Sequence, residues 1–586
     1  MNICPRFNSG ELIAFIVPVV LAIDLMQGVL VLASQVFEVL PPEEYVREVS
    51  ISEDVQVEVQ DSLVQSLILG IETFDISLVG TALTPDFEGR FPAYESGRMI
   101  EDDLLLIYSY APASMDVYRS DEFLQTVNSY LKRLVSVERA SFHVFEFFLQ
   151  EDQEAAFLKS HFEIGGRTSQ GGRLLLEATL VASLIKTSSG KWQIRRLDVE
   201  HAESAESNEV LFREITNAVG LDFNRSQANK NLRQDVANTG MSLIDSALAI
   251  VDWNRDGFWD VLTTEVGSQR VLFLNTGRGG FVRQGLPVLE PELTPSQLLF
   301  VDLDGDGLEE LIGSRIVYQD NRAWLGLHTR RDQQWIFLPK VFEFENPVGL
   351  RRNESQLLTV GDVNSDGLLD LFIGGYQNNF SGNAGNFNRV DADDGDDNLL
   401  FINQGGLRFE EESDLRGIAG TRYTYVAQLF DFDSDGDVDL FEGNDFGRNG
   451  FWENLGEGQF QGRTGHPLAN DASNTMGVTV ADWDNSGAWS VYLSNMYSHA
   501  GHRVVGLTDT VSESMLSRLS LLARGNQLFR LEQEESRISD TASSLHVNES
   551  GWAWGALFVD IDNDGDKEIF VTNGNTSNED PDAPDF

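Results

Sequence analysis

Residues 431–439 read DFDSDGDVD, a cassette with acidic side chains at positions 1, 3 and 5, glycine at position 6 and an acid at position 9. Five further cassettes follow the same plan with variations: DWNRDGFWD from Asp252, DLDGDGLEE from Asp302, DVNSDGLLD from Asp362, DWDNSGAWS from Asp482 and DIDNDGDKE from Asp560. Consecutive cassettes begin 50, 60, 69, 51 and 78 residues apart, which suits one four-stranded blade and its loops. The spacing therefore indicates a repeat architecture.

The cassettes lie between apolar runs that are rich in strand-forming residues. Before them stand ALAIV, QLLFV, LLTVG, VAQLF, GVTVA and GALFV, and after them VLTTE, LIGS, LFIGG, LFEGN, VYLSN and IFVTNG. Such flanks predict a strand–loop–strand hairpin. A second hairpin follows at LFLNTGRGGF from Leu272, LLFINQGGLRF from Leu399 and FWENLGEGQF from Phe451. Two hairpins make a blade, so residues 206–586 are predicted to form a mainly β, six- or seven-bladed β-propeller.

The acidic spacing within each cassette predicts a calcium loop. Calcium takes about six to eight oxygen ligands, and a tight loop brings positions 1, 3 and 5 around one centre. Glycine at position 6 permits the sharp reversal, position 7 offers its carbonyl, and position 9 completes the set. The predicted ligands are Asp252, Asn254, Asp256 and Asp260; Asp302, Asp304, Asp306 and Glu310; Asp362, Asn364, Asp366 and Asp370; Asp431, Asp433, Asp435 and Asp439; Asp482 and Asp484; Asp560, Asp562, Asp564 and Glu568.

Two other interpretations of the cassettes fit less well. An EF-hand needs flanking helices and a glutamate at position 12, and only Glu442 meets the second condition. Ordinary Asp-Gly hairpin turns do not need four carboxylates, which would repel one another without a cation. The fifth cassette departs from the pattern, with Ser486 and Ser490 at positions 5 and 9, and we expect it to bind calcium most weakly. Asn485 at its position 4 is expected to face away from the ion.

Cassettes and flanks together resemble the FG-GAP/VCBS repeats of the integrin α-chain head. GWAWGALFVDIDNDGDKEIFVTNG from Gly551 and FREITNAVGLDF from Phe212 resemble the UnbV and cartilage-acidic-protein branch. The resemblance implies an extracellular or envelope protein used in adhesion or recognition. It also implies that the metal ligands are positions 1, 3, 5 and 9 with the carbonyl of position 7.

Residues 45–205 have a different pattern, which predicts a small α+β domain before the propeller. Helices are expected at Val57–Asp75 and Ser120–Val135, and strands at Leu176–Leu184 and Lys191–Val199. LTPDFEG from Leu83 and KWQIRRLDVE from Lys191 resemble the NTF2-like (SnoaL-like) cone fold, whose members include enzymes, ligand binders and structural modules. His143 and His161 lie in strand-like stretches. We interpret them as ordinary strand histidines rather than catalytic residues, because no partner motif accompanies them.

Residues 1–34 are predicted to be an export signal. Arg6 precedes an apolar run over Leu12–Ile23, and small residues suit cleavage after Ala33. The alternative is an uncleaved membrane anchor, which Asp24 disfavours. Cys4 is the only cysteine, so cleavage would leave a chain without disulfides or cysteine-based zinc sites.

The charge limits the partners that can be expected. Asp and Glu number 93 against 42 Lys and Arg, a formal net charge of −51, which disfavours nucleic acid. The first hypothesis is a calcium-stabilised recognition scaffold for a protein or glycan ligand. The second is an enzyme or small-ligand binder with its site in the N-terminal domain, although no catalytic motif supports it. The third is a structural module that docks a partner through that domain.

Two further expectations concern the edges of the propeller. The segment 212–216 resembles an outer blade strand, and we expect it to pair with the last blade, around Asp560, and so close the ring. The insertion from Tyr376 to Asn398 is rich in Asn and Gly and ends in DADDGDDN. A solvated loop is favoured there over a recognition loop or an extra cation site.

Overall fold

The computed structural model describes residues 43–573, apart from 102–104, 151–152, 209–211, 225, 238–245, 266–268, 286–296, 314–315, 320, 332–333, 347–356, 377–391, 394, 419, 470, 499–512 and 533. The predicted export signal, Cys4 and most of the 376–398 insertion lie outside the described residues. Among the described helices, none is long and apolar enough to cross a membrane. The chain divides into two compact units, residues 1–214 with 499–516 and residues 215–498 with 517–586, which are described separately.

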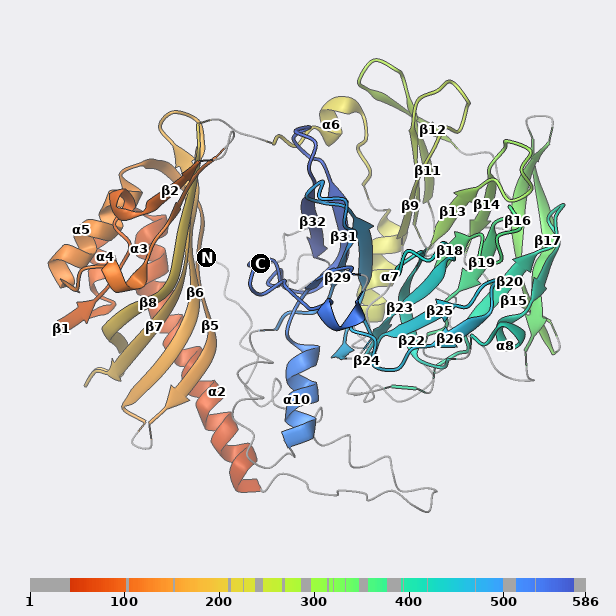
Figure 1. Cartoon of the computed structure of the whole chain (residues 1–586). Helices are drawn as coiled ribbons and strands as arrows, with labels where there is room; N and C mark the ends of the chain where they lie inside the picture. The colour runs from red at the N-terminus through yellow and green to blue at the C-terminus, as the bar shows by residue number, and fades with distance from the viewer. Residues whose placement is uncertain are drawn as a thin grey trace. The chain divides into compact units, whose positions relative to one another are not determined.

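The N-terminal unit is a curved, mostly antiparallel sheet with helices on one face (Figure 1). Its main path runs β2-β3-β8-β7-β6-β5, and β1 pairs with β8 and β4. The strands are β1 Leu83–Gly89, β2 Arg98–Glu101, β3 Leu106–Ser109, β4 Tyr118–Arg119, β5 Leu134–Leu149, β6 Ala155–Thr168, β7 Arg173–Lys186 and β8 Trp192–Ser207. The helices are α2 Glu43–Leu63, α3 Leu69–Glu72, α4 Ile76–Gly80 and α5 Ser120–Leu131, with a π-helical turn at Val64–Ile68.

The strands expected in this unit are found, although the one expected at Lys191–Val199 is β8, which continues to Ser207. Leu176, Ala178 and Leu180 are buried in β7 and alternate with more exposed residues, as the period of two predicted. The helix expected at Val57–Asp75 is part of a helical segment that starts at Glu43. The helix expected at Ser120–Val135 ends at Leu131, because β5 already begins at Leu134.

Aromatic side chains fill the space between the helices and the sheet. Phe123 of α5 packs edge-on against Phe87 and Phe91, with ring centroids 5.0 and 5.4 Å apart. Phe91 also contacts Tyr130 and Phe162. Such edge-to-face contacts add to the large apolar area that these rings bury.

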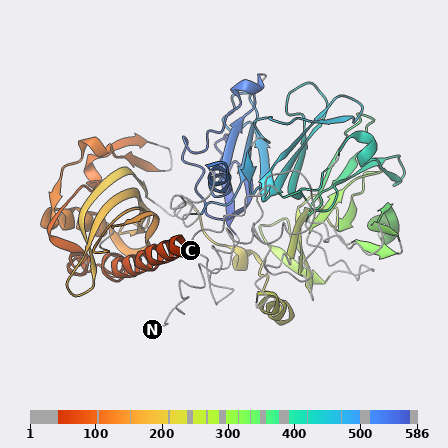
Figure 2. The same cartoon turned by 90° about the horizontal axis from the view of Figure 1, so that it is seen from below.

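The second unit is a β-propeller whose sheets follow one another around an arc (Figure 2). Five blades of three to five strands are formed, and a strand pair carries the sixth cassette. Their strands are β9 Ser246–Val251, β10 Asp260–Glu265, β11 Gln269–Asn275 and β12 Phe281–Gly285; β13 Leu298–Val301, β14 Glu310–Gly313, β15 Val317–Gln319, β16 Arg322–Arg331 and β17 Gln334–Glu345; β18 Leu358–Gly361, β19 Asp370–Ile373, β20 Leu399–Asn403 and β21 Phe409–Glu411; β22 Tyr423–Phe430, β23 Asp439–Asp445, β25 Gly450–Asn454 and β26 Phe460–Gly462; β28 Gly477–Ala481, β29 Ser490–Ser494 and β30 Gln527–Arg530; and the pair β31 Ala553–Val559 and β32 Glu568–Asn573. Short strands β24 Gly447–Arg448 and β27 Ala472–Ser473 pair with each other. Helices α6 Thr216–Val219, α7 Gln227–Ala237, α8 Ser413–Arg416 and α10 Glu513–Leu522 lie outside the blades.

The cores of the propeller lie between consecutive blades. In blades two, three and five the second strand is buried on both faces, since every residue of β14, β19 and β29 is buried. One apolar cluster joins blade two to blade three, and others join three to four and four to five. This burial explains why the runs after the cassettes are continuous rather than alternating.

The predicted ring closure through residues 212–216 is not seen. Residues 212–215 form no strand, and the sheet of β31 and β32 has two strands in the described part of the chain. In a complete blade the fourth strand pairs with the third strand. In the described part of the chain no third strand lies beside β32, so residues 212–216 have no strand with which to complete that blade.

The likeness of this segment to an outer strand nevertheless has a structural basis. Gly220 after α6 and Gly417 after α8 are both left-handed, and a Cβ on either would lie 2.5 Å from a carbonyl oxygen of the next blade, that of Phe281 or Phe460. The segment before blade one therefore has the same local structure as the segment before blade four, a short helix that ends in a left-handed glycine packed against the outer strand.

Candidate metal-binding loops

Each of the six cassettes forms the loop between the first two strands of its blade or strand pair. In the fourth, the two carboxylate oxygens of Asp431 accept the backbone N–H groups of Asp435 and Gly436, both at 3.1 Å. Asp433 also accepts the N–H of Asp435, and Asp435 that of Asp437. Equivalent bonds hold the first, third and fifth loops. Positions 1, 3 and 5 are thus folded toward one centre.

Two positions of each loop have left-handed backbone, of which the sequence pattern identified one. Glycine at position 6 has φ between 80° and 104° in all six loops, as the predicted reversal requires. Position 4 is left-handed as well, with φ of 63° at Ser434 and 73° at Gly305. Arginine, serine and asparagine occupy position 4 in the other loops. The loop therefore imposes the left-handed backbone at this position even where the residue is not glycine.

Three loops bring acidic oxygens within 4.8 Å of one another. These groups are Asp302, Asp304 and Asp306; Asp431, Asp433 and Asp439; and Asp560, Asp562 and Asp564. In the sixth loop Asp566 and Glu568 also approach Asp564, so the side chain at position 7, expected to offer only its carbonyl, joins the cluster. Among the described residues no group donates a hydrogen bond to the buried Oδ1 atom of Asp560, which suits a cation as its missing partner. The donor sets consist of oxygen atoms and fit calcium.

Position 9 has a second role that the spacing did not reveal. Asp439 is 1% exposed, and its two oxygens accept the N–H groups of Phe432 at 3.1 Å and Asn454 at 2.8 Å. Asp260 and Asp370 make the same pair of bonds in their blades. Position 9 therefore fastens the base of the loop to the third strand.

Burial also changes the ionisation of position 9. It raises the pKa of Glu310 to about 7, that of Asp370 to about 6 and that of Asp439 to about 7, and nearby cassette carboxylates add to the effect. A cation beside these groups would favour their charged form.

An asparagine recurs at the end of the third strand in blades one, three and four, and its role was not predicted from the sequence. Asn403 and Asn454 end the third strands of blades three and four, and their amide groups donate to Leu303 O and Val363 O of the preceding loops, both at 2.8 Å. Asn275 stands at the same place in blade one. The shared Asn in LFLN, LFIN and FWEN was the available signal.

The fifth loop already contains cationic groups from the protein. The Arg530 guanidinium donates to Asp484 Oδ2 at 3.0 Å and to Ser486 Oγ at 2.5 Å. Hydrogen bonds from Ser486 and Arg530 lower the pKa of Asp484. Lys567 Nζ lies 3.2 Å from the carbonyl oxygen of Asp482, and Asn485 points to the next loop, where it donates to Gly565 O. A positive side chain thus stands where calcium would bind.

We expect the fifth loop to stay free of calcium when the fourth and sixth are filled. It offers two carboxylates, and Arg530 competes for one of them. Anomalous scattering from crystals grown at limiting calcium measures this. Strong density in the fifth loop beside an empty fourth or sixth loop would contradict the ranking. The triple variant Ser486→Asp, Ser490→Asp, Arg530→Gln should gain one calcium site in calorimetry.

Glu442, the position-12 glutamate, points away from the fourth loop and into the protein. It is 2% exposed and accepts a 2.7 Å hydrogen bond from Asn398 Nδ2. Burial raises the pKa of Glu442 to about 7. Burial also raises the pKa of Asp445 to about 6, and this carboxylate accepts a hydrogen bond from Tyr376 Oη. The EF-hand interpretation is therefore excluded for this loop by geometry as well as by its flanking strands.

We expect Glu442→Gln to stabilise the calcium-loaded protein at pH 8 by up to about 3 kcal/mol and to have little effect at pH 5. Because the folded-state pKa is raised, the folded protein holds an extra proton between about pH 4.5 and 7, and stability falls as pH rises through that window. Denaturant unfolding at both pH values measures the change. The exposed Glu410→Gln is the control, and an equal gain at both pH values would contradict the assignment.

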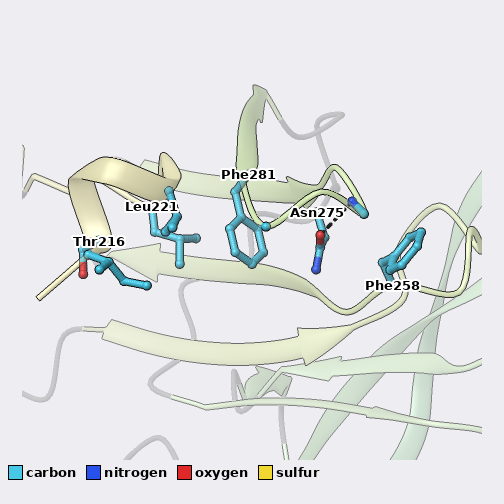
Figure 3. Close-up of a pocket in the computed structure, with 9 residues that line it drawn as sticks. Thr216, Leu221, Phe258, Asn275 and Phe281 are labelled. Atoms are coloured by element: carbon cyan, nitrogen blue, oxygen red, sulfur yellow. Dashed lines mark hydrogen bonds between the residues drawn. The ribbon is translucent and has the colours of Figure 1, made fainter. Parts of the chain in front are cut away.

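A pocket of about 480 Å³ lies beside the first loop (Figure 3). Phe258, at position 7 of that loop, and Phe281 of β12 line it together with Thr216 and Leu221. Asn275 also lines it, and its Oδ1 accepts the N–H of Gly277. The walls are largely apolar, so a ligand bound here would also contact the first loop.

His143 and His161 lie on the face of the N-terminal sheet opposite the helices. Phe162 and Ile164, which alternate with His161 along β6, belong to the core. The two histidines therefore lie outside the core between the sheet and the helices.

Comparison with known proteins agrees with this architecture. A family described as FG-GAP-like repeat matches residues 252–313 and 431–493, which span the first and second and the fourth and fifth cassettes. The chain therefore carries FG-GAP-like repeats in a β-propeller. No curated protein matches the chain.

Solved structures resemble the N-terminal part of the chain. A conserved protein from Planctomyces limnophilus is 18% identical and covers 25% of this chain and 98% of its own, with a TM-score of 0.20. A ketosteroid isomerase-like protein from Erwinia carotovora is 18% identical, covers 25% and 94%, and has a TM-score of 0.18. Aln2 from a Streptomyces species is 14% identical, covers 26% and 92%, and has a TM-score of 0.20.

Proposed function

We propose that this chain is an exported, calcium-loaded β-propeller that presents a recognition surface to a protein or glycan and has no catalytic activity. The observation that carries the proposal is the convergence of carboxylates in the loops, together with the buried oxygen of Asp560 in the sixth, which has no hydrogen-bond partner within the part of the chain that the structure describes. Oxygen donors from positions 1, 3, 5 and 9 would hold the ion. Bound calcium would supply a fixed positive charge that cancels carboxylate repulsion and rigidifies the end of each blade.

The repeat architecture supports the recognition role. Blades joined by continuous apolar cores form a rigid frame, and loops on a rigid frame are the usual location of binding surfaces. The net charge of −51 favours partners other than nucleic acid. Export agrees with the predicted leader over residues 1–34, and calcium at extracellular concentrations would fill weak loops.

Two measurements on the full-length protein test the proposal. Calorimetric titration of chelator-dialysed protein with calcium should show several sites, with fewer in variants that replace Asp431 or Asp560 by alanine. Arrays of extracellular proteins and glycans should then show a ligand that is bound in calcium and released by EGTA. Absence of calcium binding would overturn the metal role, and a ligand held equally in EGTA would separate recognition from calcium.

A further inference from the structure

Histidine and glutamate side chains form two neighbouring rows across the outer face of the N-terminal sheet. Residues directly opposite in neighbouring strands share a face, and so do residues i and i+2 of one strand. His143 of β5 faces His161 of β6, which faces Thr179, which faces His201 of β8. In the adjacent row, Glu163 of β6 faces Glu177 of β7, which faces Glu203 of β8.

Three members of these rows converge. The ligand atoms of His161, Glu163 and Glu177 all lie within 4.8 Å of one another, and His161 Nε2 is 3.7 Å from Glu163 Oε1. Glu163 is 3% exposed, whereas His161 is half-buried and Glu177 is exposed. The cluster thus has a buried carboxylate at its base and an open side through which an ion can enter.

The charges of this cluster are only partly balanced by the protein. Glu163 and Glu177 are like charges directly opposite each other, an unfavourable pairing in a sheet. Arg139 Nε lies 2.7 Å from Glu163 Oε2, but 62% of its side chain is exposed, so the guanidinium can leave without a burial penalty. Ser141 Oγ also donates to Glu163.

We propose that His161, Glu163 and Glu177 bind a divalent transition-metal ion of the Zn²⁺ class. An imidazole nitrogen with two carboxylates is a donor set that zinc accepts, and three protein ligands leave a coordination position open. Calcium prefers oxygen donors throughout, so this site is chemically distinct from the propeller loops. Arg139 then acts as the competitor of the metal for Glu163, holding that carboxylate in place when no ion is bound.

The test uses full-length protein with calcium in excess, so that the propeller loops are filled. Titration with Zn²⁺ should show one binding site. When Co²⁺ replaces Zn²⁺, the bound ion should absorb visible light, as expected for Co²⁺ in a coordination sphere of low symmetry. His161→Asn and Glu177→Gln should each weaken Zn²⁺ binding at least tenfold. His201→Asn, which changes the same histidine row beyond Thr179, should leave it unchanged, and Arg139→Gln should strengthen it several-fold.

The outcomes separate a metal site from an ion-pair network. If wild-type protein binds no Zn²⁺ in excess calcium, or if His161→Asn and Glu177→Gln bind it as wild type does, the proposal is overturned. Equal weakening by His201→Asn would also overturn it, because the site would then be elsewhere in the row. Glu177 is exposed, so its variant should fold, and circular dichroism checks this. The Arg139→Gln variant distinguishes the two models best, because its Zn²⁺ affinity should increase if the residues bind metal and should not increase if they form only an ion-pair network.

Discussion

Chelation of calcium is expected to lower the melting temperature of the full-length protein by about 10 °C or more. An ion that binds only the folded state adds about 4 kcal/mol per site when it is present at 1,000 times its dissociation constant. Without it, Asp431, Asp433 and Asp435 stand together in one small loop, and their repulsion opposes folding. If the predicted leader is removed, no cysteine remains to compensate with a disulfide.

The measurement is thermal unfolding of protein dialysed against EGTA, then with calcium restored. Magnesium is the control cation, because it demands near-octahedral geometry and retains its water, and it should restore less stability than calcium. An unchanged melting curve in EGTA would show that the loops do not hold calcium. A curve restored equally by magnesium would indicate general charge screening instead.

Local features of the propeller could be predicted from the sequence because they depend on neighbours in the chain. The apolar runs around DFDSDGDVD predicted the hairpin that β22 and β23 form. Glycine at position 6 predicted the left-handed turn, since few other residues adopt that backbone conformation readily. The same reasoning predicted the alternating strand β7 in the N-terminal unit.

Features that depend on pairing between distant segments could not be predicted in the same way. Asn403 donates to Leu303 O, 100 residues earlier, and Arg530 reaches Asp484, 46 residues earlier. The expected strand at 212–216 has a strand-like pattern, but a strand needs a neighbour to accept its hydrogen bonds. In the described residues that neighbour is absent, and the segment leads instead into α6.

The acidic pattern also could not reveal which carboxylate oxygens face an ion and which face the backbone. Positions 5 and 9 are both aspartate in three of the six cassettes, so residue type does not distinguish them. Only the fold shows that Asp439 is buried under the loop and fastened to two N–H groups, whereas Asp435 is exposed and accepts one. Positions 5 and 9 should therefore respond differently to mutation.

Asp439→Ala is expected to destabilise the protein by about 2–5 kcal/mol even in EGTA. The substitution removes both acceptors of the N–H groups of Phe432 and Asn454, and each buried donor left unsatisfied costs about 1–3 kcal/mol. It also loosens the third strand, through which Asn454 bonds to Val363 O of the preceding loop. Denaturant unfolding in EGTA and in calcium measures the loss under both conditions.

Asp435→Ala is the matched control, because this side chain belongs to the same loop but is exposed and accepts only the N–H of Asp437. In EGTA it should change stability by less than about 1 kcal/mol, and in calcium it should abolish the stabilisation that the fourth loop contributes. The difference between the two variants in EGTA isolates the fastening role of position 9 from metal binding. If Asp439→Ala matched wild type in EGTA, the buried carboxylate would act through calcium alone, and the hydrogen bonds at the base of the loop would contribute no net stability.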